Sequence, residues 1–226
     1  GAIWCFQEIE NKTKRTGEVD QPAELANLLS VSATPLTSGF GKAIDFSGGG
    51  YGNAIVSTVK VVSSRTVALP NPAGGEARCA LVEHMVMPNA SGRPFSFVVI
   101  STHLCNKHVE NRLAAVKVIN ELLEVKYDGY VILCGDFNAT PDSPTIKALE
   151  AAGWRWKRPK ETASAPADKP TVLIDYIFVR GESHNVQILD SAVIDAPVAS
   201  DHRPVQSTIR FRIHYGGEFR DGRMLK

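Results

Sequence analysis

The residues best suited to chemistry follow an apolar run in the middle of the chain, in the segment Gly135-Asp136-Phe137-Asn138. We expect Asp136 and Asn138 to point the same way, because they alternate and Gly135 lets the backbone turn after the strand. A carboxylate can polarise water or hold a divalent cation, and a carboxamide can donate to a phosphoryl oxygen. The pair suits phosphate-ester chemistry, but a plain Asp-Phe-Asn turn explains the segment alone equally well.

Other apolar runs also end in residues that could take part in such chemistry. Glu8 follows the run that begins at Ala2, and His103 ends the run 95–104. By itself, a polar residue at a strand end is more often solvated or structural than catalytic. Its repetition favours a shared site, because α/β sheets bind ligands beyond the carboxyl ends of their strands.

Asp175 lies inside the apolar run 172–179, which we interpret as a strand. A buried carboxylate is costly without a partner, so Asp175 requires a histidine, an arginine or a metal ion. Asp201 and His202 precede the last predicted strand, 205–213. We expect Asp175 to hold the His202 imidazole in one tautomer while His202 faces the substrate. Asp201 is then free to help bind a cation or water.

Short strands and a few amphipathic helices must position these groups. Residues 40–87 predict a series of hairpins, with a turn at 47–50. The longest predicted helix covers 107–126, and the expected inward-facing residues are Val109, Leu113, Val116, Ile119 and Leu123. Two shorter helices are capped by Asp20 and Ser143, with Leu25, Leu28 and Leu29 expected inside the first and Ile146 and Leu149 inside the second. This order indicates an α+β or layered α/β fold.

Three residues are weaker candidates for substrate binding. Asn53 opens a predicted strand, and Arg112 lies one turn into the longest helix. Trp156 belongs to the basic, aromatic segment 154–160, which we name the basic lip. Either this lip meets a phosphate or a base, or its tryptophan packs under a loop while its charges are solvated. We favour the packed interpretation for Trp154.

The 226 residues fit one large domain or two small ones. The formal net charge is +1, so any contact with nucleic acid must come from a local patch. No apolar run approaches membrane-spanning length. The four cysteines lack metal-ligand spacing and predict buried free thiols, which fits a reducing, cytoplasmic compartment: Cys5, Cys79, Cys105 and Cys134.

In their order and context, five motifs resemble the endonuclease/exonuclease/phosphatase superfamily, which includes DNase I. The motifs are Gln7-Glu8, Thr102-His103-Leu104, Gly135-Asp136-Phe137-Asn138, Ile174-Asp175-Tyr176 and Ser200-Asp201-His202. The resemblance extends from Ile3 to about Ile213. It implies a four-layered α/β/β/α sandwich of two mixed sheets with the site at one edge. It also implies hydrolysis of a phosphate ester with Mg²⁺ or Mn²⁺.

The resemblance implies a role for each motif residue. Glu8 ligates the metal ion, and Asp201 supports the metal ion or its waters. Asp136 orients or deprotonates the attacking water. The remaining roles fall to Asn138, which positions the phosphate, to His103, which contacts a phosphoryl oxygen, and to His202, which is held by Asp175 and stabilises the transition state.

The chain departs from the family pattern in two places. Family members carry an Asn-bearing strand ahead of the Gln-Glu strand, and this chain begins at the Gln-Glu strand. We therefore expect an N-terminally truncated domain over 1–213, an unpaired strand edge beside Glu8, and a tail over 214–226 that lacks strand character. The carboxylate that DNase I pairs with its histidine has no evident match, and Asn53 stands near that place.

The sequence thus predicts a metal-dependent phosphodiesterase. Its substrate is a phosphate ester of a small molecule, a lipid head group or a nucleic acid. A DNA endonuclease or exonuclease of the same superfamily is the second interpretation. A catalytically weakened binding module is a third, from another class.

Overall fold

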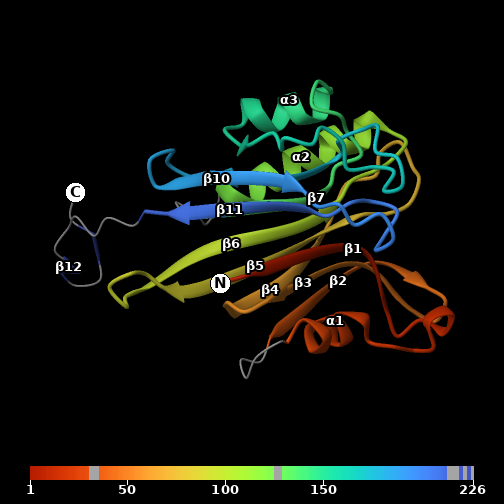
Figure 1. Cartoon of the computed structure of the whole chain (residues 1–226), viewed down its shortest axis with the longest axis horizontal. Coiled ribbons are helices and arrows are strands. Elements are labelled where there is room, and N and C mark those ends of the chain that lie inside the picture. Colours follow the sequence, from red (N-terminus) through yellow and green to blue (C-terminus); the bar gives the residue numbers. More distant parts are fainter. Residues whose placement is uncertain (31–35, 125–128, 213–218, 221–222, 225–226) are drawn as a thin grey trace.

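The computed structural model describes residues 1–30, 36–124, 129–212, 219–220 and 223–224. Two β-sheets pack face to face, and helices cover their outer faces (Figure 1). Helices α2 (Val109–Glu124) and α3 (Pro144–Ala151) lie over one sheet, and α1 (Gln21–Leu29) lies below the other. This arrangement confirms the predicted four-layered α/β/β/α fold.

The larger sheet has six strands in the order β4-β5-β6-β7-β9-β8. Only β6 and β7 run parallel, joined by α2, and the other neighbours are antiparallel, so this sheet is mixed. Its strands are β4 (Lys60–Ala68), β5 (Cys79–Pro88), β6 (Pro94–His103), β7 (Tyr130–Asp136), β8 (Arg155–Trp156) and β9 (Asp175–Arg180). The central strand β7 buries Val131, Ile132 and Leu133 in succession, as expected for a strand covered on both faces.

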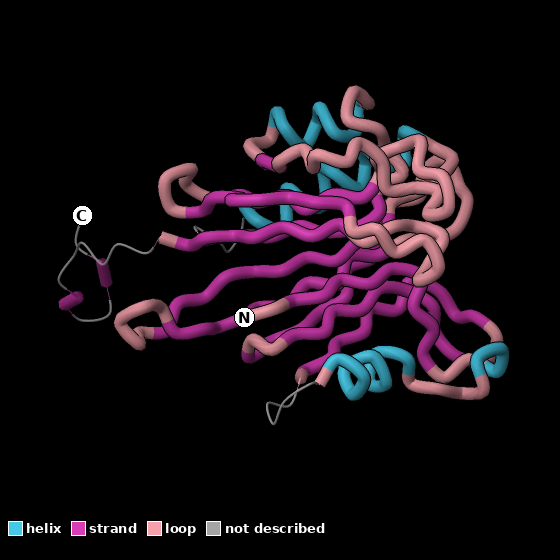
Figure 2. Tube along the Cα trace, in the orientation of Figure 1, coloured by secondary structure: helices cyan, strands magenta, loops and turns pink. Residues whose placement is uncertain are grey.

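The smaller sheet is antiparallel in the order β1-β3-β2, and a short 3₁₀ helix, Lys14–Thr16, follows β1. Further strands form separate antiparallel pairs, β10 with β11 and β12 with β13 (Figure 2). The bounds are β1 (Ile3–Asn11), β2 (Thr37–Phe46), β3 (Gly49–Ser57), β10 (Val186–Val193), β11 (Val205–Phe211), β12 (Phe219–Arg220) and β13 (Arg223–Met224). Within the described ranges β1 pairs with β3 alone, which matches the unpaired edge expected beside Glu8.

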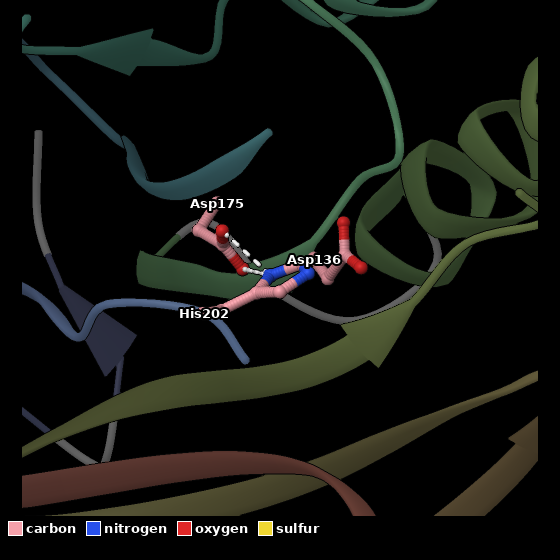
Figure 3. A group of neighbouring side chains, drawn as sticks. All are labelled: Asp136, Asp175 and His202. Carbon is pink, nitrogen blue, oxygen red and sulfur yellow. Dashed lines mark hydrogen bonds and ion pairs between the residues drawn. The ribbon is translucent and has the colours of Figure 1, made fainter. Parts of the chain in front are cut away.

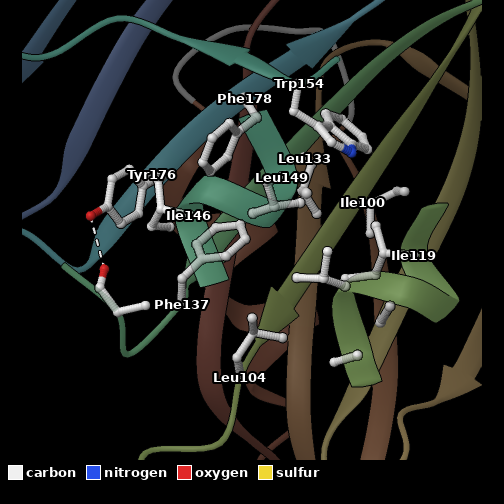
Figure 4. Close-up of a cluster of buried hydrophobic side chains, with 14 of the residues drawn as sticks. Ile100, Leu104, Ile119, Leu133, Phe137, Ile146, Leu149, Trp154, Tyr176 and Phe178 are labelled. Carbon is white, nitrogen blue, oxygen red and sulfur yellow. Dashed lines mark hydrogen bonds between the residues drawn. The ribbon is translucent and has the colours of Figure 1, made fainter. Parts of the chain in front are cut away.

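Two apolar cores separate these layers. One lies between the six-stranded sheet and helices α2 and α3, where Tyr176 and Phe178 stack and Phe137 packs edge-on against both (Figure 4). The other lies between the sheets and includes Ile55 and Leu81. The site strands β6 and β7 contribute to both cores, so their ends are held by packing on two faces.

Several expected details differ. Helix α1 buries Pro22 and Ala26, and Leu28 is 70% exposed, because only a narrow stripe of this short helix meets the sheet. Leu113 of α2 is likewise 38% exposed. Strand β9 begins at Asp175, later than expected, because Val172 forms a bridge with Ala165.

Further expectations concern the end of the longest helix, the domain boundary and the tail. The end expected for the longest helix, at 126, and the expected domain boundary at 213 lie outside the described residues. Strands β12 and β13 pair within the segment that was expected to lack strand character. The short antiparallel pair therefore corrects that expectation for the four described tail residues.

Candidate active site

Strand register gathers three candidate residues into one row at the edge of the six-stranded sheet. The parallel pairing of β6 and β7 places His103 beside Asp136. The antiparallel pairing of β7 and β9 places Asp175 on the other side of Asp136. Directly opposed residues on neighbouring strands lie within side-chain reach. The sheet itself therefore builds a His-Asp-Asp row from residues far apart in the sequence.

The turn after β7 fixes Asp136 and Asn138 together. Gly135 has a φ of 152°, and a Cβ there would lie 1.9 Å from the Thr102 carbonyl oxygen, so only glycine fits. Asn138 has a left-handed φ of 47°, which is uncommon outside glycine and characteristic of functional turns. Its backbone N–H donates to Asp136 Oδ1 at 2.7 Å, and its Nδ2 donates to Oδ2 at 3.2 Å.

His202 contacts Asp175, as the sequence predicted. The imidazole Nδ1 lies 3.0 Å from Asp175 Oδ2 and 3.2 Å from Oδ1 (Figure 3). Ser164 Oγ donates to Asp175 Oδ2 at 2.6 Å. The His202 loop is fixed in turn by the backbone of Arg203, whose N–H donates to the Ser164 carbonyl. Asp175 thus orients the ring, and Ser164 supports both partners.

The pKa values of the side chains in and beside the row are shifted in different directions. Burial raises the pKa of Asp136 to about 7, and the nearby Asp175 carboxylate adds to this rise. The hydrogen bond that the His202 ring donates to Asp175 raises the pKa of His202 to about 9. Burial lowers the pKa of His103 to about 3, with Arg78 and His202 contributing. Near neutral pH the row therefore combines a cationic His202, a neutral His103 and a carboxyl poised to exchange a proton.

The two expected metal ligands lie at the exposed side of this row. Glu8 has a left-handed φ of 58° in a bulge of β1, and its side chain is 57% exposed. Its Oε1 lies 3.8 Å from His103 Nδ1, while Asp136 Oδ2 lies 3.4 Å from Nε2 of the same ring. Asp201 is exposed and accepts a hydrogen bond from Ser200 Oγ. Such carboxylates suit a hard divalent cation, and the strained Glu8 backbone is typical of a functional position.

Asp136, Asp175 and His202 also offer ligand atoms within 4.8 Å of one another. Asp175, however, already accepts from His202 and from Ser164. We therefore interpret the trio as a histidine-carboxylate pair beside a second, buried carboxyl group. The gathered negative charge still favours a nearby cation, because burial of carboxylates without full compensation is costly.

The structure does not bring the three weaker candidates together. Asn53 is buried and donates to the Cys79 carbonyl, and it lines a small pocket that His103 also lines. Arg112 donates to the Cys105 carbonyl and to Thr145.

Trp156 donates to Glu150 and packs edge-on against Tyr176. Its indole contributes to the core beside α3, as does the buried Trp154, which donates to Asn120. The packed interpretation of the basic lip therefore holds for both tryptophans.

Sequence reasoning missed three residues around the row. Arg78 donates from Nη1 to His103 Nδ1 at 3.3 Å. Tyr51 hydrogen-bonds Glu8, which together with burial raises the pKa of its phenol. Ser164 supports Asp175. None occurs in an apolar run that ends in a polar residue, the signal that found the others.

The comparisons with known proteins agree with the fold. The sequence matches the Endonuclease/Exonuclease/phosphatase family over residues 2–202, so the chain belongs to that family. No curated protein matches it. Within the described residues, no helix has the length and apolar character needed to cross a membrane.

Several solved structures share the fold. An endonuclease/exonuclease/phosphatase from Beutenbergia cavernae is 20% identical with a TM-score of 0.72, over 92% of this chain and 62% of that chain. The mannosyl-6-phosphatase of Bacteroides thetaiotaomicron is 16% identical with a TM-score of 0.66, over 92% and 85%. The human Nocturnin catalytic domain, with bound sulfate, is 20% identical with a TM-score of 0.63, over 93% and 81%.

Proposed function

We propose that this protein is a metal-dependent phosphodiesterase that cleaves its substrate with a water molecule activated by Asp136. The observation that carries the proposal is the row of His103, Asp136 and Asp175, completed by His202. Membership of the family supports hydrolysis of a phosphate ester as the reaction class.

The chemistry follows from the roles that these side chains can take. Water attacks phosphorus, its proton passes to Asp136, and the phosphorus–oxygen bond to the leaving group breaks. A pKa of about 7 suits Asp136 to this exchange near neutral pH. The cationic His202 side chain stabilises the negative charge that develops on the phosphoryl oxygens.

Asn138 and His103 position the phosphoryl group beside Asp136. Asn138 Nδ2 lies 3.1 Å from His103 Nε2, so the two side chains form one contact surface next to the base. Position matters because a reacting group held in the productive geometry reacts as if its concentration were very high. The left-handed turn at Asn138 and the packing of β6 supply that rigidity.

Glu8 and Asp201 are the residues that would hold Mg²⁺ or Mn²⁺. When bound, the cation neutralises charge on the phosphate and on the leaving oxygen. The Glu8 side chain is 57% exposed, so its carboxylate can be reached by a hydrated cation. Asp201 also raises the pKa of His202, which indicates that its charge acts on the same region.

A small or flexible phosphodiester fits better than duplex DNA. Two of the four cations of the basic lip are engaged within the fold: Arg155 donates to two backbone carbonyls and Lys157 to a third. The formal net charge of +1 gives no broad basic surface. The Bacteroides neighbour is a mannosyl-6-phosphatase and the Nocturnin domain holds sulfate, so both support binding of a phosphate-like anion.

The test is hydrolysis of bis-p-nitrophenyl phosphate with Mg²⁺, with Mn²⁺ and with EDTA. We expect turnover only with a divalent cation, and recovery when Mg²⁺ is restored in excess of EDTA. Turnover that persists in EDTA would remove the metal from the mechanism. A folded protein that hydrolyses neither this ester nor abasic DNA, phosphoinositides or sphingomyelin would favour the binding module.

A further inference from the structure

Arg78 is a nearly buried cation next to the row. It lies just before β5, its side chain is 11% exposed, and its backbone carbonyl accepts from Leu69 N–H. Glu76 Oε1 lies 2.6 Å from Arg78 Nη1, and the same Nη1 lies 3.3 Å from His103 Nδ1. A charged group this deep needs a reason beyond packing, because burial of a guanidinium is costly.

The contact with Arg78 determines where the His103 ring carries its proton. A guanidinium has only donors, so Nη1 can bond Nδ1 only if Nδ1 presents its lone pair. A neutral imidazole with an unprotonated Nδ1 carries its hydrogen on Nε2. Arg78 therefore selects the tautomer whose N–H faces away from Arg78 and toward Asp136.

The opposite side of the ring agrees with this assignment. Nε2 lies 3.4 Å from Asp136 Oδ2, an acceptor, and 3.1 Å from Asn138 Nδ2, a donor. Without substrate, the two hydrogens on Asn138 Nδ2 can go to the Leu104 carbonyl at 3.0 Å and to the Asp136 carboxylate at 3.2 Å, so His103 Nε2 need not accept one of them. Nε2–H is thus left to donate to Asp136 or to a phosphoryl oxygen bound beside it.

Glu8 is the competitor for the other tautomer. Its Oε1 lies 3.8 Å from Nδ1 and would favour a hydrogen there, but Arg78 is closer at 3.3 Å. We propose that Arg78 is a positioning residue that holds His103 in the Nε2–H tautomer and so directs a donor at the substrate phosphate. The tautomer stands on the geometry alone, and only its catalytic consequence rests on the proposed function.

The direct test is the ¹⁵N spectrum of the imidazoles in metal-free protein. The chain has six histidines, and loss of one signal pair in His103→Gln assigns the ring. We expect Nε2–H in the wild type and a shift toward Nδ1–H in Arg78→Met. Arg180→Met is the matched control, because Arg180 is also half-buried with an unpaired guanidinium nitrogen but sits at the far end of β9. The control should keep the wild-type His103 signals.

Kinetics separate this role from substrate binding. We expect Arg78→Met to lower kcat by about 10- to 100-fold with KM within about twofold, and Arg78→Lys, which retains a donor, to recover part of kcat. A rise in KM at constant kcat would overturn the proposal in favour of direct phosphate binding. An Nδ1–H tautomer in the wild type would overturn it without any variant. Because the spectrum needs no turnover, its result is distinct from failure of the proposed hydrolysis.

Discussion

Two histidines lie near the same carboxylate and are shifted in opposite directions. His103 is buried beside Arg78, and its pKa falls to about 3. His202 is more exposed and bonds Asp175, and its pKa rises to about 9. Both rings are within reach of Asp136, so proximity to that carboxylate does not decide their charge.

The difference shows that the other charged neighbour of each ring determines its charge: Asp175 for His202 and Arg78 for His103. Burial disfavours the charged form of both rings. For His202 the carboxylate of Asp175 outweighs this cost, whereas for His103 the guanidinium adds to it. The row thus has a cation on one side of Asp136 and a neutral donor on the other. Such separation of similar groups by their surroundings is how active sites obtain distinct acid and base functions.

The largest effect should come from removing the shared carboxylate. Asp136→Asn should lower kcat on bis-p-nitrophenyl phosphate by about 10²- to 10⁴-fold, because the general base is lost while the shape is kept. Asp142→Asn is the control, since Asp142 is highly exposed near the same turn. Wild-type turnover in folded Asp136→Asn would show that water is activated elsewhere.

Next in size is the loss of the partner of His202. Asp175→Asn should lower kcat by about 10- to 100-fold and bring the pKa of His202 down from about 9 toward 6.5. A histidine with a raised pKa stabilises the fold fully below about pH 6.5, and this contribution disappears as the pH rises through about 9.

The variant should therefore lose that pH dependence of unfolding in the same window. NMR titration in EDTA and urea unfolding from pH 6 to 10 measure both quantities. An unchanged His202 pKa in Asp175→Asn would refute the assigned cause. His103 should keep its signals, which serves as the internal control.

Much of the site could be predicted from the sequence, because a charged or polar residue inside or at the end of an apolar run is easy to recognise. Asp175 in an apolar run required a partner, and His202, just before the last predicted strand, was a candidate with suitable chemistry. The polar ends of the strands at His103 and Asp136 were recognisable for the same reason.

Arg78 could not be predicted from the sequence, because its contact with His103 depends on the register of β5 and β6, where Ala80 opposes Thr102. Pairing between segments that distant leaves no local signal in a single sequence. The exposure of Leu28 was missed for a related reason: helical spacing gives a face, but not the width of the surface that it meets.

A smaller effect, on stability, is expected at Glu83 and tests whether a shifted pKa by itself identifies a functional residue. Glu83 of β5 is 1% exposed, and among the described residues Ser64 Oγ alone donates to it, at 3.3 Å; burial raises its pKa to about 7. Gly39 faces it so closely that a Cβ would lie 1.9 Å from Oε1. In the unfolded chain the carboxyl ionises near pH 4.5, so stability falls as the pH rises from about 4.5 to 7.

Glu83→Gln should therefore raise the free energy of unfolding at pH 8 by about 2–3 kcal/mol, change it little at pH 4, and leave kcat unchanged. Urea unfolding at both pH values measures this effect. Glu121→Gln, an exposed helix position, is the control and should change stability by less than about 0.5 kcal/mol. Loss of turnover in Glu83→Gln would indicate that the functional site extends into the core between the two sheets.

The smallest effect is expected at the basic lip, which carries charge without the geometry of the row. Arg155 donates to the Gly181 and Val186 carbonyls, and the Arg158 guanidinium lies 5.6 Å over the Trp156 ring. Replacing Arg155, Lys157 and Arg158 together by Ala should lower stability by about 1–3 kcal/mol, because these bonds tie β8 to its neighbours.

KM for the best substrate should stay within about twofold of the wild type in this triple variant, because Arg155 and Lys157 already donate to backbone carbonyls and Arg158 lies over the Trp156 ring, which leaves these cations poorly placed to bind an anion. Arg65→Ala, an exposed position on β4, controls for the general loss of positive charge. Steady-state kinetics at low and physiological salt are decisive, since contacts with a polyanion weaken as salt rises. A KM that increases several-fold in the triple variant, most strongly at low salt, would make the lip a substrate contact. The division of the molecule into a chemical row and a structural lip would then be wrong.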